Sequence, residues 1–107
     1  MRASRSRVRA ACDDAAVSEP VARRVVVHGT VQGVFFREAT RRRAESRGVR
    51  GWVRNNDDGT VEAIFEGEPE AVDFMVQFVH EGPGAAQVKH VDVEDAQPEG
   101  IDGFEVR

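Results

Sequence analysis

The residues best suited to chemistry lie in one short stretch, GTVQGVFFR, at residues 29–37. Gly29 and Gly33 allow the backbone to turn so that several N–H groups can point toward an anion. Arg37 ends the stretch, and its planar guanidinium can donate two hydrogen bonds to phosphoryl oxygens. The stretch therefore predicts an anion cradle, although a connecting loop whose Arg37 faces solvent explains the spacing equally well.

A second polar residue, Asn55, ends the stretch GWVRN, just before a run of turn residues. Its amide can both donate and accept hydrogen bonds, so it is able to orient a water molecule. Asparagine is also common in turns, and Asn56 beside it belongs to the same turn signal. From residue type and position alone, a role in the turn is the stronger interpretation of Asn55.

The chain pattern indicates the elements that would position these residues. Strands are expected where β-branched or alternating apolar residues end at glycine or at turn residues, and helices where such breakers are absent. The resulting prediction is a strand over residues 23–29, a helix over 36–47, a hairpin with strands over 49–55 and 60–67, a helix over 69–81, a strand over 86–94 with a change of phase near Lys89, and a short closing strand over 104–107.

The order β-α-β-β-α-β is that of the ferredoxin-like split βαβ arrangement. We expect an α+β sandwich in which an antiparallel sheet of four to five strands has two helices on one face. The first helix should bury Phe36, Thr40 and Ala44, which recur every four residues. Fold alone does not select a function, because this plan serves RNA binders, metal carriers and enzymes alike.

The 107 residues suffice for one domain, which we expect over residues 21–107. Residues 1–20 show no sustained period and end at Pro20, so we expect a disordered extension. The chain has no apolar run long enough to cross a membrane, and residues 1–20 lack the core of a signal peptide. Cys12 is the only cysteine, which suits a reducing, cytoplasmic location. No surface run is conspicuously apolar, which favours a monomer.

The net charge of −4 hides an asymmetry between the two halves of the chain. Residues 1–54 hold 13 arginines against 5 acidic residues, and residues 55–107 hold 2 basic residues against 14 acidic ones. A basic half can indicate a nucleic-acid partner. An RNA-binding sheet, however, would expose aromatic residues on its strands, and here Phe65 belongs to the alternating core set, which leaves Trp52. We therefore expect no nucleic-acid partner.

Metal binding and nucleophilic catalysis find little support. Metal carriers of this fold have two cysteines in the loop after the first strand, and this loop has none. The histidines His28, His80 and His90 are 52 and 10 residues apart, which matches no ligand pattern. Cys12 lies in the expected extension, and no serine occupies a nucleophile elbow. We expect neither a metal nor another cofactor.

Together, GTVQGVFFR and GWVRN followed by DDGTVE resemble the acylphosphatase family over roughly residues 23–107. Two separate motifs in the right order make the resemblance specific. Members of this family hydrolyse the carboxyl–phosphate anhydride of small acyl phosphates without a metal. The family's catalytic arginine ends the first motif, at Arg37, and its catalytic asparagine ends the second, at Asn55.

The resemblance implies an acyl phosphate as substrate and inorganic phosphate as product and inhibitor. It also implies that Asn55 positions the attacking water while Arg37 and the loop amides hold the phosphoryl oxygens. The loop residues so implied are Val31, Gln32, Gly33, Val34, Phe35, Phe36 and Arg37. Because the carboxylate leaves readily, a phosphate oxygen of the substrate can serve as the base. The main alternative is a non-catalytic module that binds acyl phosphates or other anions.

Overall fold

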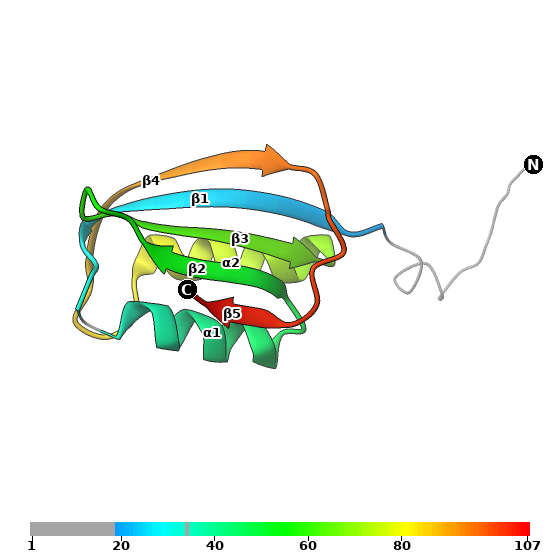
Figure 1. The fold of residues 1–107 in the computed structure, drawn as a ribbon, viewed down its shortest axis with the longest axis horizontal. Coiled ribbons are helices and arrows are strands. Elements are labelled where there is room, and N and C mark those ends of the chain that lie inside the picture. Colours follow the sequence, from blue (N-terminus) through cyan, green and yellow to red (C-terminus); the bar gives the residue numbers. More distant parts are fainter. Residues whose placement is uncertain (1–18, 34) are drawn as a thin grey trace, which may run out of the picture.

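The computed structural model describes residues 19–33 and 35–107 (Figure 1). Its elements follow the predicted order, with differences of a few residues at their ends. They are β1 (Val21–Thr30), α1 (Phe36–Ser46), β2 (Arg50–Asn55), β3 (Val61–Gly67), α2 (Pro69–Glu81), β4 (Gln87–Ala96) and β5 (Phe104–Val106). The extension expected over residues 1–20 lies almost entirely outside the described residues, so it stays a prediction.

Five strands form one sheet in the order β4-β1-β3-β2-β5. Neighbouring strands are antiparallel except that β5 pairs with β2 in parallel, so the expectation of a wholly antiparallel sheet was wrong at this edge. The reason is that residues 97–103 lead from the end of β4 into β5 at the same end of the sheet (Figure 1). The chain therefore enters β5 antiparallel to β4, and hence in the direction of β2.

The two helices divide the sheet between them, and the ferredoxin-like α+β fold is confirmed. Helix α1 packs on β2 and β5, whereas α2 packs on β1, β3 and β4. Apolar residues that alternate along the strands pack against the inner faces of the two helices. On each helix, the buried residues follow the period of 3.6 residues per turn. The buried residues of this core include Val25, Val27, Val53, Val61, Ala63 and Phe65 from the strands, and Phe36, Thr40, Ala44, Val72, Met75 and Val79 from the helices.

β4 contains a bulge opposite the end of β1, from which the chain continues into the loop before α1. Pairing with β4 shifts between His28 and Gly29, so that Lys89 has no partner on β1. A Cβ atom at Gly29 would lie 2.1 Å from the carbonyl oxygen of Gln87, so only glycine fits there. The bulge accounts for the change of phase near Lys89. A bulge disrupts the ladder and increases the local twist, and this one lies opposite the end of β1, where the loop begins.

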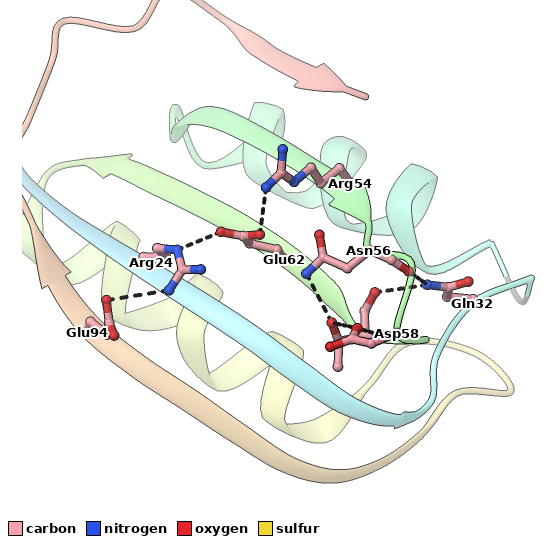
Figure 2. A network of polar contacts seen from close by, with 8 residues as sticks. Arg24, Gln32, Arg54, Asn56, Asp58, Glu62 and Glu94 are labelled. Atoms are coloured by element: carbon pink, nitrogen blue, oxygen red, sulfur yellow. Dashed lines mark hydrogen bonds and ion pairs between the residues drawn. The ribbon is translucent and has the colours of Figure 1, made fainter.

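The sheet face opposite the helices is covered by paired charges (Figure 2). Glu62 of β3 is only 5 % exposed and accepts hydrogen bonds from Arg24 Nε at 2.6 Å and from Arg54 Nη2 at 3.0 Å. Arg24 also contacts the exposed Glu94, at 3.5 Å. Strand alternation places Glu62 on this face, but the burial of its side chain depends on arginines from both neighbouring strands.

These arginines keep Glu62 ionised. Burial by itself raises the pKa of its carboxyl group, but the hydrogen bonds from Arg54 and Arg24 outweigh burial and hold the pKa below its ordinary value of 4.5. The pKa is thus lower in the folded chain than in the unfolded one. The pairing therefore stabilises the fold fully above pH 4.5, and this contribution is lost as the pH falls through the folded-state pKa.

We expect Glu62→Gln to lower the free energy of unfolding at neutral pH by about 1–3 kcal/mol, because two arginines lose the buried charge that they share. Glu94→Gln is the matched control, since it alters the exposed partner of the same Arg24 and should cost less than about 0.5 kcal/mol. Urea denaturation measures both losses. The decrease in the free energy of unfolding caused by Glu62→Gln should be smaller at about pH 3 than at neutral pH. Equal losses in the two variants, or a loss independent of pH, would contradict this account.

Candidate active site

One cavity lies where the loop after β1, the start of α1 and the ends of β2 and β5 meet. Its volume is about 330 Å³, within the range of small-molecule sites. It brings together Arg37 and Asn55, the two residues from the separate motifs. The lining residues are Val31, Gly33, Phe35, Phe36, Arg37, Glu38, Asn55 and Val106. Of the other predicted loop residues, the side chain of Gln32 is used elsewhere, and Val34 lies outside the described residues.

The loop backbone turns in the left-handed region at two positions. Gly33 has a φ of 77°, and Phe35 has φ 60° and ψ 24°. Among the described residues, Phe35 is the one non-glycine residue with a positive φ. A left-handed residue followed by a right-handed helical one directs successive N–H groups to the same side and forms an anion-binding concavity. Phe35 and Phe36, the first residue of α1, form such a pair.

Helix α1 begins at this concavity without a polar cap. Phe35 occupies the N-cap position, and its carbonyl oxygen accepts the first helical hydrogen bond, from Ala39 N at 3.0 Å. Its side chain has no atom that could accept from the first-turn N–H groups, which a serine or aspartate would do. These N–H groups also form the positive end of the helix dipole. An anion in the cavity is therefore suited to accept hydrogen bonds from them.

Gln32 attaches the loop to the turn between β2 and β3 (Figure 2). Its Nε2 atom donates to the backbone oxygens of Asn56 and Thr60, at 2.8 and 2.9 Å. Asp58 closes the turn, because its Oδ1 accepts from the N and Oγ1 atoms of Thr60, which lowers the pKa of Asp58. The side chain of Gln32 thus holds the loop in position, and its predicted part in phosphate binding rests on its backbone N–H.

Asn55 and Asn56 have different environments. Asn56 belongs to the turn, where its N and Nδ2 atoms donate to Thr60 O at 2.8 Å and to Thr60 Oγ1 at 3.0 Å. Asn55 lines the cavity instead, and its Oδ1 atom is buried without a hydrogen-bond partner among the described residues. A buried acceptor left unpaired costs about 1–3 kcal/mol, so this atom is suited to receive a hydrogen bond from water or ligand.

Arg37 lines the cavity and also contacts the end of the chain. Its Nη1 atom donates to the backbone oxygen of Arg107 at 2.7 Å, and Arg107 N donates to Val53 O at 2.8 Å. The guanidinium of Arg107 stacks over Trp52 at 4.9 Å, which adds a cation–π contact. Because a guanidinium has five N–H donors, one contact leaves Arg37 able to bind an anion.

Glu38 also lines the cavity, and we did not predict it. Its carboxylate accepts hydrogen bonds from Arg41 and, at 3.2 Å, from Arg42 Nε. The bond from Arg41 is the main cause that holds the pKa of Glu38 below its ordinary value. The sequence contained a signal for this pairing, because two arginines follow the glutamate by three and four residues in the same helix. One lining residue of the cavity is therefore an ionised glutamate.

The described part of the chain offers no competing metal centre or membrane span. Over residues 19–33 and 35–107, no three His, Cys, Asp or Glu side chains are grouped so that they could hold a metal ion. His28 and His90 instead contact the two oxygens of Asp92, at 3.0 and 2.7 Å, and this lowers the pKa of Asp92. Neither α1 nor α2 is long and apolar enough to cross a membrane.

Known proteins are similar to this chain in both sequence and fold. The family model for acylphosphatase matches residues 23–106. The chain belongs to the acylphosphatase family. Curated acylphosphatases of Haloarcula marismortui and Rubrobacter xylanophilus are 59 % and 60 % identical to it, over 83 and 85 residues. Each alignment covers 78 % of this chain, and they cover 91 % and 77 % of the two relatives.

A solved structure of an acylphosphatase from Coxiella burnetii is similar in fold, with a TM-score of 0.79 and 39 % identity. The match covers 82 % of this chain and 93 % of that one. Family membership and these relatives support a hydrolase of the acylphosphatase type.

We expect Gln32→Glu to weaken inhibition by inorganic phosphate about tenfold or more, because a carboxylate would face two carbonyl oxygens and release the loop. Gln87→Glu is the matched control, since it adds the same charge at an exposed position that pairs with Thr30, where β1 ends, without disturbing the two bonds. Inhibition constants for phosphate measure the difference. A similar rise in both variants would indicate a charge effect and contradict the positioning role of Gln32.

Proposed function

We propose that this protein hydrolyses small acyl phosphates to a carboxylate and inorganic phosphate, with Arg37 and Asn55 as its catalytic residues. One observation supports this most: Asn55, whose buried Oδ1 has no hydrogen-bond partner among the described residues, lines the same cavity as Arg37 and the start of α1. An acceptor for water thus lies in one cavity with donors for a phosphoryl group, which is what hydrolysis of a phosphate anhydride requires.

In this proposal, binding of the phosphoryl group uses the backbone N–H groups of the loop and the guanidinium of Arg37. The loop residues concerned are Val31, Gln32, Gly33, Val34, Phe35, Phe36 and Arg37. Negative charge on the phosphoryl oxygens is stabilised by these fixed dipoles and by the start of α1. Since positive charge and oriented amides come from the chain itself, we propose that neither a metal nor another cofactor takes part.

The attacking water donates a hydrogen bond to Asn55 Oδ1, which holds it in line with the bond to the acyl oxygen. A bond forms from the water oxygen to phosphorus while the bond from phosphorus to the acyl oxygen breaks. The carboxylate leaves with the electron pair, and the proton from water passes to a phosphoryl oxygen of the substrate. The products are the carboxylate and inorganic phosphate, which remains able to occupy the cradle and inhibit.

We further propose that the protein acts as a cytoplasmic monomer without a nucleic-acid partner. The single Cys12 supports a reducing compartment. Among the described residues, the large apolar side chains that are exposed are Phe35, Val93 and Val106, and two of these three line the cavity. This leaves little exposed apolar surface for a second copy of the chain.

We expect Asn55→Ala to lower kcat for benzoyl phosphate by about 10²–10³-fold while phosphate still inhibits, because water loses its positioning group and the cradle remains. Arg37→Ala should lose both turnover, by about 10³-fold or more, and phosphate inhibition. Ultraviolet absorbance follows the reaction, with EDTA present. Asn56→Ala and Arg42→Ala are the matched controls, since they remove the same groups from the turn and from the outer surface of α1.

Loss of phosphate inhibition in Asn55→Ala would contradict the division between water positioning and phosphoryl binding. A loss of turnover as large in Asn56→Ala would indicate that the turn, and not a water at Asn55, is what matters. If the folded wild-type protein binds phosphate but has no turnover, the alternative of a non-catalytic anion-binding module replaces the enzyme.

We expect Glu38→Gln and His28→Ala to keep kcat within about threefold of wild type, because the substrate's own phosphoryl oxygen takes the proton and no side chain acts as base. Glu38 is the more stringent test, since this ionised residue lines the cavity. Steady-state kinetics with benzoyl phosphate at neutral pH provide the measurement. A drop in kcat of about 10²-fold in either folded variant would identify a protein base and overturn this step.

A further inference from the structure

The exposed apolar side chains of this protein are concentrated at the cavity. Among the described residues, three large apolar side chains are exposed: Phe35 at 84 %, Val93 at 43 % and Val106 at 39 %. Phe35 and Val106 both line the cavity, whereas Val93 lies on β4 and does not. The two come from opposite ends of the sequence, one from the loop before α1 and the other from β5. Their convergence therefore gives the cavity an apolar side.

Phenylalanine at position 35 is also unfavourable for the stability of the fold. A left-handed backbone suits glycine or asparagine and is strained for a bulky side chain. The backbone conformation at Phe35 is accounted for by the anion concavity, but that concavity needs no phenyl ring. With 84 % of its surface exposed, the ring gains little from packing. Strain that folding does not explain points to a function for the ring itself.

The cavity is polar where the phosphoryl group would bind and apolar elsewhere. Arg37, Asn55 and the amides provide the donors and the acceptor, and Phe35 and Val106 provide apolar surface in the same cavity. An acyl phosphate has the same two parts, a charged phosphoryl group and an acyl chain joined through one oxygen. When the phosphoryl group occupies the polar part, the acyl chain has to extend past the remaining lining residues.

We propose that Phe35 and Val106 form an acyl subsite, which makes the protein selective for acyl phosphates with an apolar, above all aromatic, acyl group. This inference rests on the proposed function and specifies its substrate class. The ring of Phe35 stacks on or packs against the acyl group, and Val106 contacts it from the β5 side. Water leaves both apolar surfaces when the substrate binds.

Glu38 adds discrimination by charge. Glu38 lines the same cavity, and Arg41 and Arg42 offset part of the charge of its carboxylate. An acyl group that has a carboxylate or phosphate of its own would meet this negative charge as well as the apolar surface. The subsite is therefore less favourable for anionic acyl groups than for neutral ones.

The test compares benzoyl phosphate with acetyl phosphate in wild type and Phe35→Asn. Asparagine tolerates the left-handed backbone, so the loop keeps its shape while the apolar ring is removed. Because an amide at the N-cap can also accept from the first-turn N–H groups, the readout is the ratio of the two substrates, from which an effect on the phosphoryl group cancels. The ratio of kcat/KM for benzoyl phosphate to kcat/KM for acetyl phosphate should fall about tenfold, mainly through a rise in KM for benzoyl phosphate. Inhibition by inorganic phosphate and the melting temperature serve as checks that the cradle and the fold remain.

Val106→Thr provides a second, nearly isosteric change, and Val93→Thr is its matched control outside the cavity. We expect Val106→Thr to lower the ratio of benzoyl to acetyl turnover, by about threefold, and Val93→Thr to leave it unchanged. An unchanged ratio in both Phe35→Asn and Val106→Thr would overturn the acyl subsite. An equal loss for both substrates in Phe35→Asn would overturn it too, because the substitution would then act on phosphoryl binding and not on the acyl group.

Failure of this inference can be told apart from failure of the proposed function. If wild type hydrolyses acetyl phosphate and Phe35→Asn leaves its selectivity unchanged, the function stands and the subsite is wrong. If wild type hydrolyses neither substrate, the function is wrong, and calorimetric titration then tests the subsite with two stable analogues, phenacylphosphonate and acetonylphosphonate. Tighter binding of the phenyl compound that is lost in Phe35→Asn supports the subsite, and equal binding of the two compounds overturns it.

Discussion

The two hydrogen bonds from Gln32 to the turn between β2 and β3 are the constraint on which the candidate site depends. They connect the loop after β1 to the segment that directly follows Asn55, so the two motifs share one scaffold. The loop needs this support because its backbone is left-handed at Phe35, a conformation that costs free energy for a residue other than glycine. Once it is fixed, the first-turn amides of α1, Arg37 and Asn55 line one cavity.

The rest of the fold supports the same region from the other side. β5 pairs in parallel with β2, and the next residue, Arg107, accepts a hydrogen bond from Arg37 through its backbone oxygen. Stacking of Arg107 on Trp52 fixes this end of the chain against the sheet. Phosphate oxygens would compete with this carbonyl oxygen for the donors of Arg37. The last strand is therefore part of the site, since it supplies Val106 and orients the arginine.

Much of this arrangement follows from the sequence because its signals are local. Alternation in the hairpin, the four-residue spacing of Phe36, Thr40 and Ala44, and the turn residues after Asn55 were sufficient for the elements and the core. Arg37 and Asn55 became candidates through their motifs, although residue type alone favoured a turn role for Asn55. The structure assigns that role to Asn56.

Features that depend on several elements were not predicted. The burial of Glu62 requires arginines from two neighbouring strands, and the direction of β5 depends on the end of the sheet at which residues 97–103 cross. The position of Glu38 in the cavity depends on how α1 meets the loop. Strand and helix periods specify which face a residue occupies, but not which side chains from other elements cover it.

The most direct test of the central claim, that the loop amides and Arg37 bind a phosphoryl group, is a titration with inorganic phosphate followed by amide proton–nitrogen NMR. The account predicts that the largest shifts occur at the backbone amides of residues 32–37 and at the side chains of Arg37 and Asn55. The groove beside α1, lined in part by Arg42, Arg43 and Phe78, should show little change. Largest shifts in that groove, with residues 32–37 unaffected, would contradict the account.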